Sequence, residues 1–227
     1  CGRHRLCCLS RVSSRTEANA RSAPPVITVD LPSSEALAAA STAFTFALVG
    51  IGLLIVGSAV AAATWARSLN GWALGGVSFV LSQTAQVVAL FLFGPLIAAF
   101  TSAPLQEASR AIILSTAARR VRGERPSTAF GFGHGAIDLL TSSLIPTLSA
   151  VIILGGVGDG SIFVGLDAEV TEKVNAVAVF LTSQSLLSAA LLIVQAALML
   201  GLHALLTAIV LRVVVRGGGA RTIGRGL

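Results

Sequence analysis

Charged residues are scarce in this 227-residue chain, and cysteine and tyrosine are scarcer still. Asp, Glu, Lys and Arg make up 11% of the sequence, whereas soluble domains have about 25%. Tyrosine is absent, and the three cysteines, Cys1, Cys7 and Cys8, lie within the first eight residues. The remainder therefore has neither a disulfide framework nor a cysteine metal site. This composition excludes a typical soluble domain and a disulfide-rich secreted one.

Long apolar runs replace the missing charge. The sequence is 54% hydrophobic, with a mean hydropathy of +0.86. Residues 36–66, 68–106, 139–157 and 174–211 contain no charged side chain, and each run is near or above the roughly 20 residues that span a bilayer. Because backbone groups in lipid must form hydrogen bonds internally, these segments are expected to be helical. The predicted fold is an all-α, multi-pass transmembrane bundle.

The positive charge does not indicate a nucleic-acid protein. The formal net charge is +6, but the arginines form short clusters between apolar runs instead of one basic face. Such clusters are typical of the ends of transmembrane helices. The expected partners are therefore membrane lipid and other membrane polypeptides, and no nucleic acid.

Breaks in the apolar pattern predict about five crossings. The first helix covers 36–65, capped by the polar stretch 33–35, and a tight turn follows at 68–71. The next stretch, up to Arg119, is too long for one crossing, and Pro95 after Gly94 marks its break. The expected later elements are helices over 72–92, 96–118 and 127–154, with a kink at Pro146, then a surface segment ending near Ser188 and a last crossing up to Val215.

The ends of the chain differ from its apolar centre. Residues 1–34 are rich in Arg, Ser and Ala, which is typical of a flexible leader or an organellar targeting segment. We expect a transmembrane domain over 35–216 and a basic tail over 217–227. The positive-inside rule places Arg67, the basic loop at 119–125 and this tail on one side of the membrane. The acidic loop at 155–175 then lies on the other side, and an organellar membrane is the expected location.

Few ionisable side chains lie inside the predicted spans, and they occur at helical spacings. Glu107 and Arg110 are three residues apart on the third helix, His134 and Asp138 are four apart on the fourth, and His203 is on the fifth. Such groups cost about 2.5–3.5 kcal/mol each to insert, so they usually face a bundle interior. Each pair shares one face of its helix.

Three of these groups are expected at a similar depth. With a rise of 1.5 Å per residue, Glu107 lies ~18 Å from the basic end of its helix, His134 ~12 Å and His203 ~14 Å. A shared cavity would let Glu107 act as a general base, with His134 positioning the water. His203 would polarise the scissile carbonyl and Thr207 would donate to the oxyanion, while Arg110 orients Glu107 or supplies countercharge.

Structural interpretations of the same residues are also open. Glu107 and Arg110 are compatible with an ion pair between packed helices, and His203 with a histidine bonded to a carbonyl. Three glycines around His134 are compatible with a close helix-packing surface. A zinc ion held by His134, His203 and Glu107 or Asp138 is a further alternative, although no H-E-x-x-H pattern occurs.

At these residues the sequence resembles a known family. Residues 104–110 (Pro-Leu-Gln-Glu-Ala-Ser-Arg) are similar to an E-E-x-x-R motif, and residues 130–138 (Phe-Gly-Phe-Gly-His-Gly-Ala-Ile-Asp) to F-G-x-G-H-G-G-I-E. Both motifs are those of the YhfC-like intramembrane peptidases, relatives of the CAAX-processing and bacteriocin-protecting membrane proteases. Residues 78–83 and 203–207 carry weaker similarities, and the resemblance covers roughly 71–216.

The resemblance implies a hydrolase of membrane peptides that uses glutamate and needs no metal cofactor, although the family is also described as metallopeptidases. Gln106 stands where the family motif has its first Glu, so a catalytically inactive member is one interpretation. The Leu-Gln-Glu-x-x-Arg form also resembles a scaffold subunit of gamma-secretase. The alternative function is therefore a non-catalytic accessory subunit of a larger membrane complex.

Overall fold

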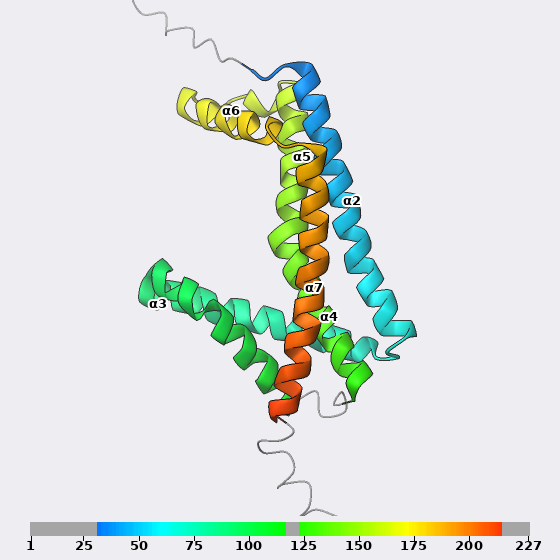
Figure 1. The fold of residues 1–227 in the computed structure, drawn as a ribbon. Coiled ribbons are helices and arrows are strands. Elements are labelled where there is room, and N and C mark those ends of the chain that lie inside the picture. Colours follow the sequence, from blue (N-terminus) through cyan, green and yellow to red (C-terminus); the bar gives the residue numbers. More distant parts are fainter. Residues whose placement is uncertain (1–30, 117–122, 215–227) are drawn as a thin grey trace, which may run out of the picture.

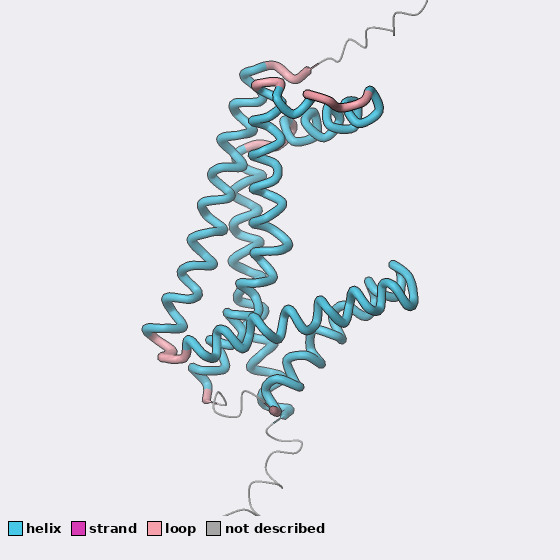
Figure 2. The backbone as a smooth tube through the Cα atoms, turned by 180° about the vertical axis from the view of Figure 1, so that it is seen from behind, coloured by secondary structure: helices cyan, strands magenta, loops and turns pink. Residues whose placement is uncertain are grey.

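The computed structural model describes residues 31–116 and 123–214, and in these two ranges every regular element is a helix (Figures 1 and 2). This confirms the all-α prediction. The principal helices are α2 (Ser34–Thr64), α3 (Leu69–Ser115), α4 (Glu124–Leu139), α5 (Ile145–Gly158), α6 (Ala168–Thr182) and α7 (Leu186–Val214).

Four helical segments in the described ranges are long and apolar enough to cross a membrane: α2, α3, the continuous segment Glu124–Gly158 and α7. Three of them stand roughly parallel as a bundle, while α3 and α6 project from it to the same side (Figure 1). The multi-pass membrane bundle is therefore confirmed, and the chain is an integral membrane protein.

The first span begins where the sequence predicts. The Ser33 hydroxyl accepts a hydrogen bond from the Ala36 N–H at 3.2 Å, which satisfies one of the unpaired donors of a helix start. The buried face of α2 consists mostly of small side chains, including Ala40, Ala43 and Ala47. Small residues let neighbouring helices approach closely, which is the usual way for helices to pack in lipid.

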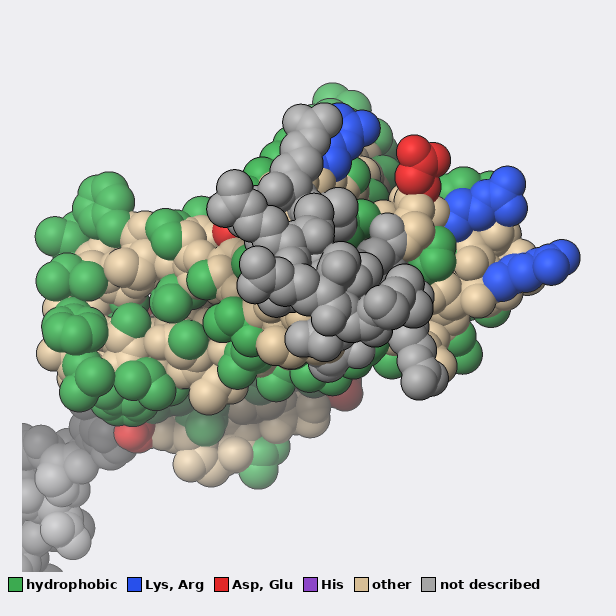
Figure 3. All heavy atoms as spheres, turned by 90° about the horizontal axis from the view of Figure 1, so that it is seen from below, with side chains coloured by type: hydrophobic (Ala, Val, Ile, Leu, Met, Phe, Trp, Pro, Cys, Tyr) green, Lys and Arg blue, Asp and Glu red, His purple; other side chains and the backbone are tan. Residues whose placement is uncertain are grey.

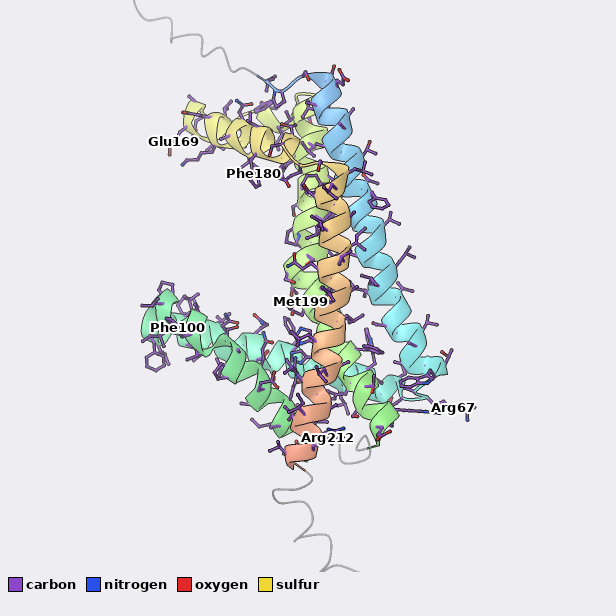
Figure 4. The ribbon with its side chains drawn as sticks, in the orientation of Figure 1. Arg67, Phe100, Glu169, Phe180, Met199 and Arg212 are labelled. Atoms are coloured by element: carbon purple, nitrogen blue, oxygen red, sulfur yellow. The ribbon has the colours of Figure 1, made fainter. Side chains whose placement is uncertain are left out.

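The predicted break at Gly94 is present and divides α3 into two arms. Gly94 has φ 83° and ψ 173°, outside the helical region, and Pro95 follows it. Both ends of α3 lie at the same end of the bundle, and Phe100 is in the part farthest from it (Figure 4). The two crossings expected at 72–92 and 96–118 thus form a hairpin that leans away from the bundle. The preceding turn ends at Ser68, earlier than the expected 68–71, because α3 already begins at Leu69.

The irregularity expected at Pro146 takes the form of a π-helical turn, η3 (Leu140–Leu144), between α4 and α5. The Ile145 N–H bonds the Leu140 carbonyl, five residues back. Pro146 has no N–H for the carbonyls of Thr141 and Ser142, which a residue at this position would otherwise serve. The wider turn accommodates the proline without interrupting the span.

Charge separates the two ends of the bundle. Arg67 and Arg212 lie at one end, which we call the basic end, and Glu169 on α6 lies at the other (Figure 4). Viewed from the basic end, apolar side chains cover much of the projecting α3 hairpin (Figure 3). Arg125 stacks over the Trp65 ring, 5.6 Å from its centroid, as expected for residues at a membrane interface. Residues 117–122, residues 1–30 of the leader expected at 1–34, and the tail expected at 217–227 lie outside the described ranges.

Candidate functional site

Glycines bring the backbones of three helices together around the site. A Cβ on Gly133 of α4 would lie 1.7 Å from the Trp72 carbonyl oxygen of α3, and one on Gly75 of α3 would lie 1.9 Å from the Phe130 carbonyl oxygen. On the opposite side of α4, a Cβ on Gly131 would lie 2.5 Å from Ala204 Cα of α7. Glycine is therefore required for α4 to fit between α3 and α7.

Arg110 is the centre of the polar cluster. Its side chain is completely buried, and Nη1 donates to Glu107 Oε1 at 2.6 Å. Nη2 contacts His203 Nδ1 on α7. The ion pair with Glu107 lies within one helix, as the spacing indicates, but the contact with His203 joins residues 93 positions apart. A buried cation needs compensating partners, and two different helices supply them.

The hydrogen bonds of His203 define its tautomer. A guanidinium group only donates hydrogen bonds, so Nδ1 of His203 must accept from Arg110. The hydrogen of the ring is then on Nε2, which donates to Asp138 Oδ2 at 2.8 Å. Both ring nitrogens are occupied. His203 is a neutral bridge between Arg110 of α3 and Asp138 of α4.

His134 is different, because neither ring nitrogen has a hydrogen-bond partner among the described residues. The side chain is fully buried. Its ring centroid lies 5.1 Å from that of His203, with an angle of 47° between the planes. The Phe79 ring meets it edge-on at 5.3 Å. The surroundings thus fix the position of the imidazole and leave both nitrogens able to interact with another group.

Unpaired buried polar atoms concentrate at this cluster. Within the described ranges, no partner is present for the following buried atoms: Glu107 Oε2, Arg110 Nε, His134 Nδ1 and Nε2, and Thr207 Oγ1. Buried polar groups in proteins nearly always have partners, so these atoms mark a place that accommodates water or a polar ligand. They offer both acceptors and donors. Glu107 is 34% exposed and Asp138 15%, which places the accessible edge of the cluster at the two carboxylates.

The donor set does not fit a metal ion. His203 has no free nitrogen, and Oε1 of Glu107 is paired with Arg110. A cationic guanidinium at the centre also opposes a second cation. Among the described residues there is no group of three or more His, Cys, Asp and Glu side chains arranged to hold a metal. The zinc alternative at His134, His203 and Glu107 therefore lacks the ligands that zinc requires.

The structure brings most of the expected site residues together. Glu107, Arg110, Asp138 and His203 form one connected chain, and His134 stacks against it. Thr207 is completely buried one turn from His203. Gln106 is only partly buried, and no hydrogen bond of its side chain occurs among the described residues.

Two contacts of the cluster were not expected from the sequence. Phe79 supports the His134 ring, and Ser78 and Ser109 bond each other at 3.2 Å between the two arms of α3. All three lie on the second and third predicted helices. The sequence does show a polar Ser within each of these apolar runs, but it does not indicate that the two serines bond each other.

The fold and the site define a multi-pass membrane protein with a buried ionic cluster between three helices. The chain belongs to the YhfC intramembrane metalloprotease family, whose model matches residues 37–218. This range includes α2, which the resemblance from 71–216 did not cover. No curated protein and no solved structure matches the chain.

Proposed function

We propose that this chain is a glutamate-dependent intramembrane peptidase whose reacting groups are Glu107 and His134. The observation that carries the proposal is the concentration of unpaired buried polar atoms, with an acid and an imidazole among them, in the bundle. Ionisable groups inside a membrane are costly and usually functional. Membership of an intramembrane protease family supports the same reaction class.

The free atoms suit hydrolysis of a peptide bond. Glu107 Oε2 takes a proton from water as the water oxygen bonds to the carbonyl carbon. The oxyanion that forms accepts hydrogen bonds from His134 N–H and Thr207 O–H. The C–N bond then breaks, and Glu107 returns the proton to the leaving amine. This sequence needs no group beyond water and the substrate.

The remaining residues hold these groups in position. Arg110 fixes one oxygen of Glu107 and leaves the other free. His203, which the sequence suggested as the group polarising the carbonyl, has both nitrogens occupied. We therefore assign it, with Asp138, a positioning role. The proposed reaction uses no metal ion, although the family is described as metalloproteases, because both nitrogens of His203 and one oxygen of Glu107 are already bonded.

A non-catalytic role in a larger membrane complex is the second candidate, and Gln106 favours it. This residue replaces the first Glu of the family motif. A closed network from Glu107 to Asp138 also suits a rigid scaffold, because its ionic contacts join α3, α4 and α7. In that case the cluster stabilises the bundle and the family chemistry is lost.

Cleavage of a membrane-spanning peptide by the purified protein in nanodiscs tests the two candidates. A peptidase loses activity in Glu107→Gln and in His134→Ala, by about 10²–10⁴-fold for loss of a general base. Glu124→Gln, at the start of α4, is the matched control because it also removes a carboxylate from the chain.

The Gln106→Glu variant separates an inactive member from an active one. In a scaffold, the original protein has no activity, and Glu107→Gln changes only stability or the recovery of partner subunits. If only the Gln106→Glu variant is active, the carboxylate at position 106 is the one required for the reaction, and the original protein is an inactive member. Activity in the original protein that survives Glu107→Gln would exclude Glu107 as the base.

A further inference from the structure

A cavity lies away from the ionic cluster, toward the acidic end of the bundle. It has a volume of about 320 Å³ and is bordered by α2, η3, α5, α6 and α7. Its size falls at the lower end of the range of ligand sites. No charged side chain lines it, so the group that it accommodates is neutral.

Thr147 presents an unpaired hydroxyl to this cavity. The residue is only 4% exposed and lies on the cavity wall. Other threonines in these helices, such as Thr42 and Thr171, donate to the carbonyl one turn back, but no hydrogen bond of the Thr147 side chain occurs among the described residues. The hydroxyl is therefore available to bond a group in the cavity, so Thr147 indicates an occupant with a polar neutral group.

The lining differs from the lipid-facing surface of the same helices. Nine of the fifteen lining residues are Ala, Ser or Thr, among them Ala43, Ala47, Ser143, Ser188 and Ala189. Lipid-facing positions of the same helices carry large aliphatic residues, such as Leu53 and Leu198. Small residues with Ser and Thr are characteristic of the interfaces between transmembrane helices. The occupant is therefore better matched by a polypeptide helix than by an acyl chain.

The position of the cavity relates it to the ionic cluster. Ser142, on its wall, is one helical turn from Asp138 and donates to the Asp138 carbonyl at 2.7 Å. Leu139, Ala196 and Leu200 form a packed core against which Leu144 of η3 packs, so a helix that occupied both places would have to run along the outside of η3. α3 and α6 project to the same side of the bundle, α3 from near its basic end and α6 at its acidic end (Figure 1).

We propose that the cavity is a docking site for the transmembrane helix of the peptidase substrate, with Thr147 bonding a carbonyl or hydroxyl of that helix. The proposal rests on the peptidase function, and it defines the substrate class: a membrane-spanning polypeptide with a face of Gly, Ala or Ser. The part of the substrate helix that docks in the cavity lies between its scissile bond and the acidic end of the bundle.

Disulfide crosslinking tests this docking without requiring cleavage. Cys1, Cys7 and Cys8 are changed to Ser, and a single cysteine is introduced by Ser143→Cys in a Glu107→Gln background. The probe is a synthetic single-span Leu/Ala peptide with Gly or Ser at every fourth position and a central cysteine. An all-Leu peptide with the same cysteine is the matched probe, and Val56→Cys, on a side chain 60% exposed on α2, is the matched protein control.

The expected result is preferential crosslinking of the small-residue peptide at Ser143→Cys. Adding Thr147→Val reduces this yield by about threefold, the change expected for one interhelical hydrogen bond of about 0.6 kcal/mol. Equal yields with both peptides, or at both cysteine positions, would overturn the proposal. Crosslinking only between two copies of the chain, or native mass spectrometry showing a lipid that Thr147→Leu removes, would overturn it as well.

The outcomes distinguish this proposal from the peptidase assignment. Crosslinking without any cleavage by the unmodified protein leaves the docking site intact and refutes the peptidase function. Cleavage without preferential crosslinking supports the peptidase function and refutes the docking site.

Discussion

Replacing Gly133 by alanine tests whether close backbone contact positions the ionic cluster. A Cβ at this residue lies 1.7 Å from the Trp72 carbonyl oxygen, so α3 and α4 must separate by about 1.7 Å to reach the 3.4 Å of ordinary contact. Backbone atoms cannot rotate away as a flexible side chain does. We expect a loss of about 2–3 kcal/mol, within or near the range of overpacked cores.

The measurement is apparent thermal unfolding in detergent, followed by loss of the monodisperse peak on size exclusion. A loss of this size corresponds to a fall of about 4–12 °C in the unfolding temperature. Gly57→Ala is the matched control, since nothing lies within 4 Å of a Cβ there. It is expected to stabilise α2 by up to about 1 kcal/mol through helix propensity.

Equal unfolding temperatures for Gly133→Ala and Gly57→Ala would refute the reasoning, because the two glycines would then have equivalent surroundings. The separation of helices has a second consequence. His134, next to Gly133, would move away from Phe79 of α3. Peptidase activity is therefore expected to fall in Gly133→Ala even at temperatures at which the protein remains folded.

Three further predictions concern the cluster and the topology. ¹⁵N NMR of histidine-labelled protein in lipid is expected to show His203 as the Nε2–H tautomer, and an Nδ1–H signal would contradict the Arg110 contact. Arg110→Ala leaves Glu107 unpaired and should cost about 3–5 kcal/mol in the unfolding assay, whereas Arg110→Lys keeps the charge and should cost less; equal losses would show that the charge does not matter. Membrane-impermeant maleimide is expected to label Arg67→Cys from one side of sealed vesicles and Glu169→Cys only from the other, and labelling of both from one side would exclude the topology described.

Local features of the fold followed from the sequence. Helix starts and ends agree with the expected positions to within a few residues for α2 and α7, since loss of charge and a polar cap are local signals. The break at Gly94 followed from a proline that cannot donate to the helix. The ion pair of Glu107 and Arg110 followed from a three-residue spacing.

The rotation of each helix about its axis could not be predicted in the same way. These spans are apolar on all sides, so no amphipathic stripe indicates which face packs inside. The contact from Arg110 to His203 and the lean of the α3 hairpin both depend on that rotation. The fixed rise along a helix predicts similar depths for Glu107, His134 and His203, whereas it gives no indication that His203 pairs with Asp138.

The glycines on α4 explain why stability and the candidate site are inseparable in this bundle. Gly131 and Gly133 face different neighbours, α7 and α3, so His134 lies on a helix held closely from two sides. Gly135 continues the series, and a Cβ there would lie 3.0 Å from His203 Cδ2. Its replacement by alanine presses on a side chain that can shift slightly, whereas Gly133 faces a fixed backbone. Gly135→Ala should therefore disturb the bridge from Arg110 to Asp138 more than it disturbs folding. A loss of activity with little change in unfolding temperature would locate a function in the His203 bridge, and parallel losses would indicate that the bridge only supports the fold.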